Sequence, residues 1–346
     1  MRVLFEELAA PQRAGGIEAA CKGLAENLSA LGQEVLRHDG SGELQSGWRP
    51  DVVHIHGIWS PALIGRWQQW WSLRVPCAVT VHGMLEPWAL AHKKFKKRLA
   101  WMVYQRRILQ SASLLHGTSE RESSSYRKLG LRPAISTIPW GIDLADTENL
   151  KAEELKIEER IALFVGRLYP VKGLPLLLDA WARVQPEGWK LRLVGPDEAG
   201  HRTELELQVE RLGLSGSVAF TGPLSGEALA EEYRQASFFV LPSHTENFGM
   251  VIGEALAHGV PVITTQGAPW ELLESEGCGW WVPVSVDGIE QALSDATKRS
   301  PKELSAMGAR GRAVVEERFA WDRIAGEFVD CYRWLLGEGP KPSCVE

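Results

Sequence analysis

The stretch Ser243-His-Thr-Glu-Asn-Phe-Gly-Met-Val-Ile-Gly-Glu-Ala-Leu-Ala-His-Gly-Val-Pro261 decides the fold. The apolar run 236–242 before it predicts a short buried strand that a proline closes. Gly259 and Pro261 then end the helix that follows the loop. A strand, a short loop and a helix form the unit that builds nucleotide sites at the carboxyl edge of a parallel sheet. The stretch therefore predicts an α/β fold.

Two carboxylates flank the loop in this stretch. Glu246 precedes the helix and Glu254 lies about two turns further on, with Gly249 between them, where backbone amides at a helix amino end can face an anion. Two carboxylates and free amides suit a ligand with hydroxyls at both ends and phosphates in the middle, such as a nucleotide sugar. The spacing alone leaves open that both glutamates are ordinary solvated side chains.

Length and composition predict two domains in a reducing compartment. The 346 residues, 45% of them hydrophobic, are enough for two cores. The five cysteines are scattered and lack metal-type spacing, which argues against a disulfide framework or a zinc site. The acids at positions 6 and 7 interrupt the first apolar run, so we expect a strand there and no signal peptide. No apolar run approaches the roughly 20 residues of a spanning helix. We expect a soluble, cytoplasmic protein.

The net charge of −6 is unevenly distributed. Residues 1–145 hold 18 basic and 12 acidic side chains, giving +6, whereas residues 146–346 hold 20 and 32, giving −12. Opposite signs in the two halves favour separate domains, with a boundary in the acidic and polar segment 144–159. The 15 tryptophans are spread along the chain and form no basic, aromatic-lined pattern, so we expect no nucleic-acid partner.

In the first half of the chain, the first strand is followed by a pair of glycines, and a later strand carries two histidines. Gly15 and Gly16 follow a strand at 2–5 and precede a helix that Gly32 ends, a geometry in which backbone amides can approach a phosphate. An ordinary flexible turn remains the alternative reading. Further on, the strand 51–56 carries His54 and His56 on the same side. Because no third ligand lies nearby in sequence, we expect no metal.

The next strand, Ala78-Val-Thr-Val81, delivers His82 and Gly83 at its carboxyl tip. A histidine at this place can belong to a site or serve as a structural hydrogen bonder. The basic run Lys93-Lys-Phe-Lys-Lys-Arg98 follows and continues as a helix through Leu109. This amphipathic helix could lie on an anionic membrane surface or bind an acceptor's diphosphate. The alternative is a solvated, charged helix face.

The second half opens with a buried strand, Ile161-Ala-Leu-Phe-Val165, followed by Gly166, Arg167, Lys172 and Gly173. Two cations at a strand-to-helix turn would add to the attraction of the helix amides for phosphate. Two further strands end at Gly195 and at Gly222-Pro223-Leu224.

Together these motifs resemble the retaining glycosyltransferases of family 4 (glycosyltransferase group 1). The resemblance rests on Glu246 and Glu254 with Phe-Gly between them, and on the Gly-Arg…Lys-Gly element of residues 166–173. It extends to Ser119-Glu120 and to Ile138-Pro-Trp-Gly-Ile-Asp143, in which Trp140 replaces the family's usual asparagine. The stretch 82–90 is similar to a subset of exopolysaccharide and lipopolysaccharide biosynthesis enzymes.

The resemblance implies the GT-B fold, in which two Rossmann-like domains face each other across a cleft. Residues 1–145 would form the acceptor-binding domain and residues 160–319 the donor-binding domain. A helix at about 320–336 would cross back onto the first domain, and residues 337–346 are predicted to be a disordered tail.

The resemblance also implies a reaction. A hexosyl group would move from a nucleoside-diphosphate sugar to an acceptor hydroxyl of a glycan or lipid-linked molecule with retained configuration, without a metal or other cofactor, in cell-surface polysaccharide or glycolipid assembly. The implied catalytic residues are His82, Glu246, Arg167 and Lys172. Those implied on the acceptor side are His56, Trp59 and His82. The donor would contact Gly15, Gly16, Gly166, Arg167, Lys172, Gly195, Gly222, Pro223, Leu224, Glu246, Asn247, Phe248, Gly249, Met250, Val251 and Glu254.

Two other functions are compatible with these motifs. One is a nucleotide-sugar epimerase of similar architecture, and the other is a non-catalytic protein that binds nucleotide sugars or polysaccharide. An epimerase changes the sugar without an acceptor, and a silent binder releases no diphosphate. The sequence identifies neither the base and sugar of the donor nor the acceptor.

Overall fold

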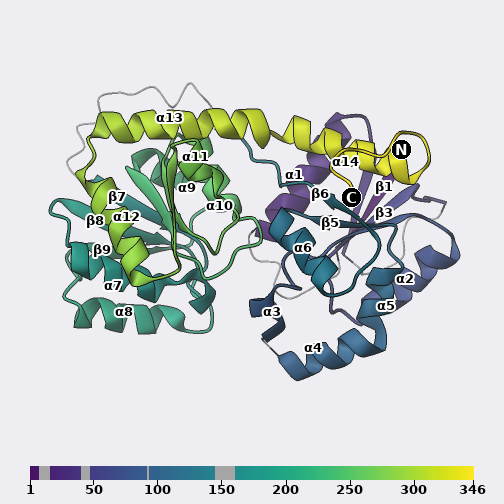
Figure 1. Ribbon diagram of the computed structural model, residues 1–346, viewed down its shortest axis with the longest axis horizontal. Coiled ribbons are helices and arrows are strands. Elements are labelled where there is room, and N and C mark those ends of the chain that lie inside the picture. Colours follow the sequence, from purple (N-terminus) through teal and green to yellow (C-terminus); the bar gives the residue numbers. More distant parts are fainter. Residues whose placement is uncertain (8–15, 40–46, 92, 145–159) are drawn as a thin grey trace. The chain divides into compact units, whose positions relative to one another are not determined.

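The computed structural model describes residues 1–7, 16–39, 47–91, 93–144 and 160–346, and these divide into two compact units (Figure 1). Unit 1 comprises residues 1–141 together with 321–346, and unit 2 comprises residues 142–320. Each unit contains a six-stranded sheet in which all paired strands are parallel, with helices packed around it. The predicted α/β fold is confirmed.

The sheet of unit 1 has the order β2-β1-β3-β4-β5-β6. The order reverses at β1, which pairs with β2 on one side and β3 on the other, so the switch point lies between β1 and β3. The strands are β1 (Arg2–Glu7), β2 (Glu34–His38), β3 (Val52–His56), β4 (Cys77–Thr80), β5 (Leu114–Gly117) and β6 (Ala134–Thr137).

The helices of unit 1 include one long segment with a π-helical turn, Trp101–Gln105, in its middle. That turn joins α4 (Lys94–Ala100) to α5 (Arg106–Gln110) without a break in the helical conformation. The other helices are α1 (Gly16–Ala30), α2 (Ala62–Ser72), α3 (Pro87–Ala91), α6 (Glu120–Lys128) and α14 (Trp321–Leu335).

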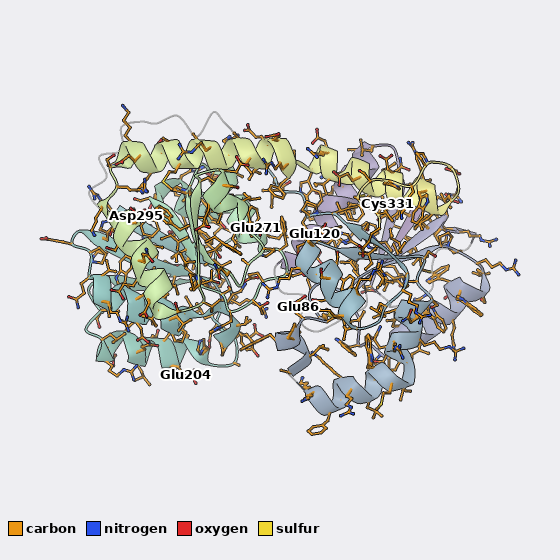
Figure 2. The ribbon with its side chains drawn as sticks, in the orientation of Figure 1. Glu86, Glu120, Glu204, Glu271, Asp295 and Cys331 are labelled. Carbon is orange, nitrogen blue, oxygen red and sulfur yellow. The ribbon has the colours of Figure 1, made fainter. Side chains whose placement is uncertain are left out.

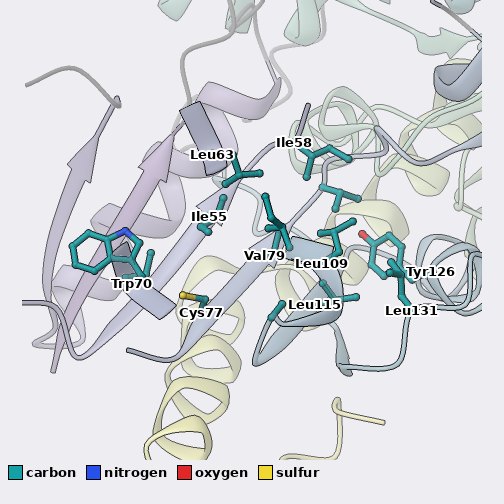
Figure 3. Packing of buried hydrophobic residues seen from close by; sticks show 14 of the residues in the cluster. Ile55, Ile58, Leu63, Trp70, Cys77, Val79, Leu109, Leu115, Tyr126 and Leu131 are labelled. Atoms are coloured by element: carbon teal, nitrogen blue, oxygen red, sulfur yellow. The ribbon is translucent and has the colours of Figure 1, made fainter. Parts of the chain in front are cut away.

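Uninterrupted apolar runs put the strands of unit 1 in its core, as expected for a parallel sheet covered on both faces. Figure 3 shows Ile55 and Val79 from neighbouring strands packing with Leu109 of α5 and Tyr126 of α6. Trp70 of α2 belongs to the same cluster, and its indole Nε1 donates to the buried carboxylate of Glu6 over 3.1 Å (Figure 3).

The helix α14 belongs to unit 1, where its apolar stripe is buried. Trp321 lies against Gly23 of α1, where an added Cβ would come within 2.3 Å of the indole. Phe328 and Tyr332 are buried further along the same stripe.

The prediction of a disordered tail at 337–346 is wrong. Val345 is buried and forms an antiparallel bridge with Ser136 of β6. The backbone amide of Glu346 donates to the carbonyl of Ile135 over 2.9 Å, and Sγ of Cys344 lies 3.7 Å from Sγ of Cys331. Figure 2 shows Cys331 on α14. Polar composition suggested disorder, but the backbone of this short tail pairs with an otherwise open sheet edge.

The sheet of unit 2 has the order β12-β11-β10-β7-β8-β9, which is the Rossmann order with its switch point between β7 and β10. The strands are β7 (Arg160–Val165), β8 (Trp189–Val194), β9 (Val218–Gly222), β10 (Phe238–Leu241), β11 (Val262–Thr265) and β12 (Gly279–Val282). The helices are α7 (Leu174–Val184), α8 (His201–Arg211), α9 (Gly226–Gln235), α10 (Met250–Ala257), α11 (Leu272–Ser275), α12 (Val286–Lys298) and α13 (Pro301–Arg318).

None of the helices within the described ranges is both long and apolar enough to cross a membrane.

Candidate active site

Two of the predicted donor residues of unit 2 meet at the switch point between β7 and β10. The loop after β7 carries Lys172 and the loop after β10 carries Glu246, and Nζ of Lys172 donates to Oε1 of Glu246 over 2.5 Å. The side chains are only 14% and 12% exposed. The hydroxyl of Ser243 donates to the same carboxylate oxygen over 2.6 Å. The structure thus brings together one cation and one acid that the sequence had assigned to a common site.

Close backbone approach holds these two loops together. Gly173 has φ +67°, and a Cβ there would lie 2.1 Å from the carbonyl oxygen of Pro242. The amide of His244 donates to the carbonyl of Val171 over 2.8 Å. A side chain at position 173 would therefore separate Lys172 from Glu246, which explains why glycine is required there.

The second predicted cation has a different partner. Arg167 donates through its guanidinium to Glu198, and its Cζ lies 5.9 Å from the ring centroid of Tyr169. Both partners of this ion pair are more than a third exposed. Arg167 stands directly after Gly166, whose carbonyl oxygen would lie 1.9 Å from a Cβ at Gly195. The backbones at the ends of β7 and β8 therefore approach too closely for a side chain at position 195.

The amino end of α10 lies immediately after the loop of Glu246. Gly249 is its N-cap with φ +88°, and Met250 and Val251 form the first helical turn. Phe248 is buried against Trp270, whose Nε1 donates to the Phe248 carbonyl over 2.5 Å. The cap residue is a glycine and offers no side-chain oxygen to these first amides, which suits an anion as their partner.

Glu254 lies in the second turn of α10 and accepts a hydrogen bond from Tyr233 of α9 over 2.9 Å through Oε2. Burial raises the pKa of Glu254, and the Tyr233 hydroxyl opposes this shift. The sequence did not indicate Tyr233, whose ring stacks on His258 at 4.9 Å.

The remaining predicted donor residues lie at neighbouring strand ends of the same unit. The amide of Gly195, directly after β8, donates to the carbonyl of Gly222, the last residue of β9, over 2.9 Å, and Pro223 and Leu224 follow directly. Asn247 belongs to the loop between β10 and α10.

In unit 1, the predicted acceptor residues His56 and His82 lie on neighbouring strand ends, with Nδ1 of His56 3.2 Å from Nε2 of His82. His82 has φ +52°, a left-handed conformation that costs a non-glycine residue about 1–3 kcal/mol and is common at functional sites. Burial lowers the pKa of His82 to about 3, with a smaller contribution from His116. The imidazole is therefore neutral near pH 7.

Glu122 of α6 holds the backbone of this turn. Its carboxylate accepts from the amide of Gly83 and from the amide of Thr118, each over 2.8 Å. Its pKa is raised by burial. Sequence reasoning named Ser119 and Glu120 instead, and Ser119 is the N-cap of α6, accepting from the Glu122 amide. The sequence signal for Glu122 is its position three residues after the serine cap, where an acid commonly completes a capping box. Here its carboxylate also accepts from the amide of Gly83 in the loop after β4.

Trp140, the departure from the family pattern, is buried between two rings. Its indole is nearly parallel to His82 at 5.6 Å and to Phe328 of α14 at 6.0 Å. It also meets His116 edge to face at 5.1 Å. The tryptophan thus links the His82 turn to the carboxyl-terminal helix.

Beneath these rings runs a chain of four hydrogen bonds, each 2.7 Å long. Nε2 of His116 faces the carbonyl oxygen of Ile138, which can only accept, so this nitrogen carries the hydrogen and Nδ1 is bare. The Thr80 hydroxyl then donates to Nδ1 of His116 and accepts from Nε2 of His54. Tyr332 of α14 donates to Nδ1 of His54. Burial lowers the pKa of both histidines and keeps them neutral near pH 7, and for neutral rings this network fixes both tautomers.

Trp59 and Gly16 complete the predicted set in unit 1. Trp59 has φ +74°, and its ring lies 6.4 Å from Trp101 and 5.7 Å from Nζ of Lys97. Its contacts with α4 and the π turn were not predicted. Gly16 is the first residue of α1, and Gly15 lies outside the described residues.

Within the part of the chain that the structure describes, one group of three side chains could bind a metal ion. Single ligand atoms of Cys21, His56 and His82 lie within 4.8 Å of one another. Nε2 of His56 is buried and has no hydrogen-bond partner among the described residues. Sequence reasoning did not find Cys21 because it comes from α1, far from both histidines in the chain.

Comparisons with known proteins identify the family of the chain. Residues 146–314 match the family described as glycosyl transferases group 1, and residues 39–141 match a glycosyl transferase 4-like domain. The D-inositol 3-phosphate glycosyltransferase of Streptomyces bingchenggensis is 30% identical over 312 residues, covering 83% of this chain and 68% of that protein. The chain belongs to the group 1 glycosyltransferases.

Solved structures with the same fold include other glycosyltransferases of GT-B type. Sucrose-phosphate synthase from Thermosynechococcus elongatus superposes with a TM-score of 0.79 at 24% identity, covering 97% of this chain and 99% of that one. Anabaena HepE, solved with UDP and glucose, has a TM-score of 0.74 at 20% identity, covering 96% and 99%. The predicted GT-B fold is confirmed.

Proposed function

We propose that this glycosyltransferase transfers a hexosyl group from a nucleoside-diphosphate sugar to an acceptor hydroxyl with retention of configuration. Cell-surface polysaccharide or glycolipid assembly is the process that the sequence resemblance suggests. The observation that carries the proposal is the Lys172–Glu246 pair at the switch point of a Rossmann-ordered sheet, which is where such sheets bind their ligands.

The diphosphate is assigned to Arg167, Lys172 and the amides at the start of α10. When the glycosidic bond to phosphate breaks, negative charge grows on the leaving oxygen. Cations and helix-end amides already in place stabilise that charge without reorganisation. Lys172 and Arg167 each hold a carboxylate, Glu246 and Glu198. Both pairs would rearrange when the diphosphate arrives.

The two ends of the donor are assigned to the two acids. Glu246, next to Lys172, would accept hydrogen bonds from sugar hydroxyls, and Glu254 from the ribose. Tyr233 holds Oε2 of Glu254 and so orients the carboxylate. That HepE was solved with UDP-glucose supports the class of donor but leaves the base and sugar of this chain's donor open.

The acceptor side is assigned to His56, Trp59 and His82 of unit 1. We assign to His82 a contact with the donor sugar near the reacting carbon. Since burial keeps its imidazole neutral, His82 would act as a hydrogen-bonding group and would not supply positive charge.

The reaction is proposed to be independent of divalent metal. In this scheme Lys172 and Arg167 do the work that a magnesium ion does on diphosphates elsewhere. The enzyme is proposed to act in the cytoplasm, with an acceptor that is a glycan or a lipid-linked molecule.

A two-stage experiment tests the proposal. Thermal unfolding is first measured with a panel of UDP, GDP and ADP sugars, because a ligand that binds only the folded state raises the unfolding midpoint. The stabilising donor is then incubated with candidate acceptors, and diphosphate release and the anomeric configuration of the product are followed by NMR. We expect acceptor-dependent release and a retained anomer.

Each alternative has its own signature in the same assay. A changed sugar in the absence of acceptor would identify an epimerase. Donor binding without diphosphate release across the acceptor panel would identify a non-catalytic binder. An inverted product would refute retention while leaving glycosyl transfer intact.

A further inference from the structure

The helical segment from α4 to α5 turns an apolar face outward. Phe95 is 87% exposed, Leu99 60%, and Met102 and Val103 are each 67% exposed. These positions recur at i, i+4, i+7 and i+8, which places them on one side of a helix. Four large apolar side chains clustered on one exposed helix face are unusual, because single exposed ones are the norm.

The opposite side of the segment is the one that anchors it to unit 1. Ile108 and Leu109 are buried in the core, and Trp101 and Tyr104 pack against it. The hydroxyl of Tyr104 donates to the carbonyl of Trp59 over 2.9 Å. The segment is thus fixed on its inner side, and Figure 1 shows α4 at the margin of its unit with the other elements of that unit on one side only.

Cations border the outward face. Lys96 lies between Phe95 and Leu99 in sequence, Arg98 precedes Leu99, and Lys94 begins the helix; all three are exposed. Lys97 differs, because its Nζ donates to the carbonyl of Ala89 and faces the Trp59 ring, and burial lowers its pKa. The basic run therefore divides into outward cations and one inward lysine, a division that the sequence pattern did not show.

We propose that this face, made of Phe95, Leu99, Met102 and Val103 with Lys94, Lys96 and Arg98, docks the enzyme onto an anionic lipid surface. A convex apolar ridge bordered by lysine and arginine fits the boundary between headgroups and acyl chains, where the apolar side chains insert and the cations meet lipid phosphates. A protein partner of matching shape would need a groove with an acidic rim, which a bilayer does not require.

The inference goes beyond the proposed reaction and does not require turnover. If the proposed function also holds, a docked enzyme would meet acceptors that are anchored in the bilayer, so a lipid-linked acceptor is the favoured class. That extension rests on the proposed function, and the binding experiment below is independent of it.

Flotation with lipid vesicles, without donor or acceptor, tests the surface. The wild-type protein is mixed with vesicles of phosphatidylcholine alone or of equal phosphatidylglycerol and phosphatidylcholine. We expect binding to the anionic vesicles that weakens at high salt, and little binding to the neutral ones. Phe95→Ser with Leu99→Ser, and separately Lys94→Glu with Lys96→Glu and Arg98→Glu, should each reduce binding at least tenfold.

Matched controls keep the result specific. Leu207→Ser removes a 61% exposed apolar residue of α8 in unit 2, and Arg211→Glu with Lys302→Glu reverses exposed charges of that unit; both should bind like the wild type. Unfolding midpoints should be unchanged, because every altered side chain is exposed. Absence of wild-type binding, or equal binding by the surface variants, would overturn the proposal. So would a dimer that the Phe95→Ser and Leu99→Ser changes dissociate, since the face would then bind a second copy.

Discussion

Nζ of Lys172 lies 2.5 Å from Oε1 of Glu246, and this ion pair joins the two loops that leave β7 and β10 at the switch point of unit 2. The pair is mostly shielded from water, so each partner depends on the other in the ligand-free protein. Arg167 is held in the same way by Glu198 but is more exposed. In our account both carboxylates compete with the donor's diphosphate for a cation.

Removing the negative charge of Glu198, which pairs with Arg167, should tighten donor binding. We expect Glu198→Gln to lower the Kd for UDP or the matching nucleoside diphosphate up to about fivefold, because an exposed pair is worth about 0.2–1 kcal/mol. Isothermal titration calorimetry measures this. Glu210→Gln makes the same charge change at an exposed position of α8 and should leave the Kd unchanged. Equal affinities of the Glu198→Gln variant and the wild type would mean that Arg167 does not meet the diphosphate.

Glu254 should matter for the nucleoside part of the donor and not for the phosphates. Glu254→Gln is expected to weaken binding of the nucleoside diphosphate about tenfold, because hydrogen bonds to charged groups are worth about 1.5–3 kcal/mol. Its affinity for inorganic pyrophosphate should stay at the wild-type value. Tyr233→Phe, which leaves the carboxylate without its orienting hydroxyl, should show a smaller loss of the same kind. Equal losses for both ligands would argue against a ribose contact.

The histidine chain of unit 1 predicts acid sensitivity. Burial lowers the pKa of His116 to about 4 and that of His54 well below 6.5, so the unfolded chain binds protons that the folded chain does not. Stability is then fully present above about pH 6.5 and falls as the pH drops toward 4, by up to about 1.4 kcal/mol per pH unit for each histidine. Chemical denaturation across this range measures the slope.

A variant of His116 tests whether protonation of these histidines causes the loss of stability at low pH. His116→Gln should be less stable at pH 7, since it breaks the hydrogen bonds to Thr80 and Ile138, but its stability should fall less steeply between pH 6.5 and 4. An unchanged slope would assign the acid sensitivity to other groups.

Chelation should leave turnover unchanged. The proposed reaction needs no divalent metal, so activity after dialysis against EDTA is expected to equal that of the untreated enzyme. The competing outcome is loss of activity on chelation, which would mean that the enzyme requires a metal. Cys21, His56 and His82 are the side chains placed to bind it. Loss of activity that zinc restores in the wild type but not in Cys21→Ala would show that these side chains hold a required metal.

Much of the fold could be predicted because it follows from local pattern. Apolar runs marked the parallel strands, and the glycines and cations after the strand at 161–165 marked the loop that carries Lys172. Pairing of residues 344–346 with β6 could not be predicted, because a free sheet edge becomes visible only once strand order is known.

The site showed the same limit. The sequence identified Glu246 and Lys172 as members of one site, but not that Glu198 holds Arg167 or that Tyr233 holds Glu254. Glu198 lies in the loop between β8 and α8, and Tyr233 lies on α9, so neither partner leaves a signal in the local spacing around Arg167 or Glu254. Trp140 was recognised only as a departure from the family, and its stacking on His82 and Phe328 depends on the return of α14 to unit 1.

The most direct test of the central claim is the turnover number of Arg167→Ala and Lys172→Ala with the natural donor and acceptor. If these cations stabilise the leaving diphosphate, each change should lower kcat about 10²- to 10³-fold while circular dichroism shows an intact fold. Lys190→Ala, a lysine at the opposite end of the unit 2 sheet, should keep wild-type turnover. Near-normal kcat in both Arg167→Ala and Lys172→Ala would contradict the account.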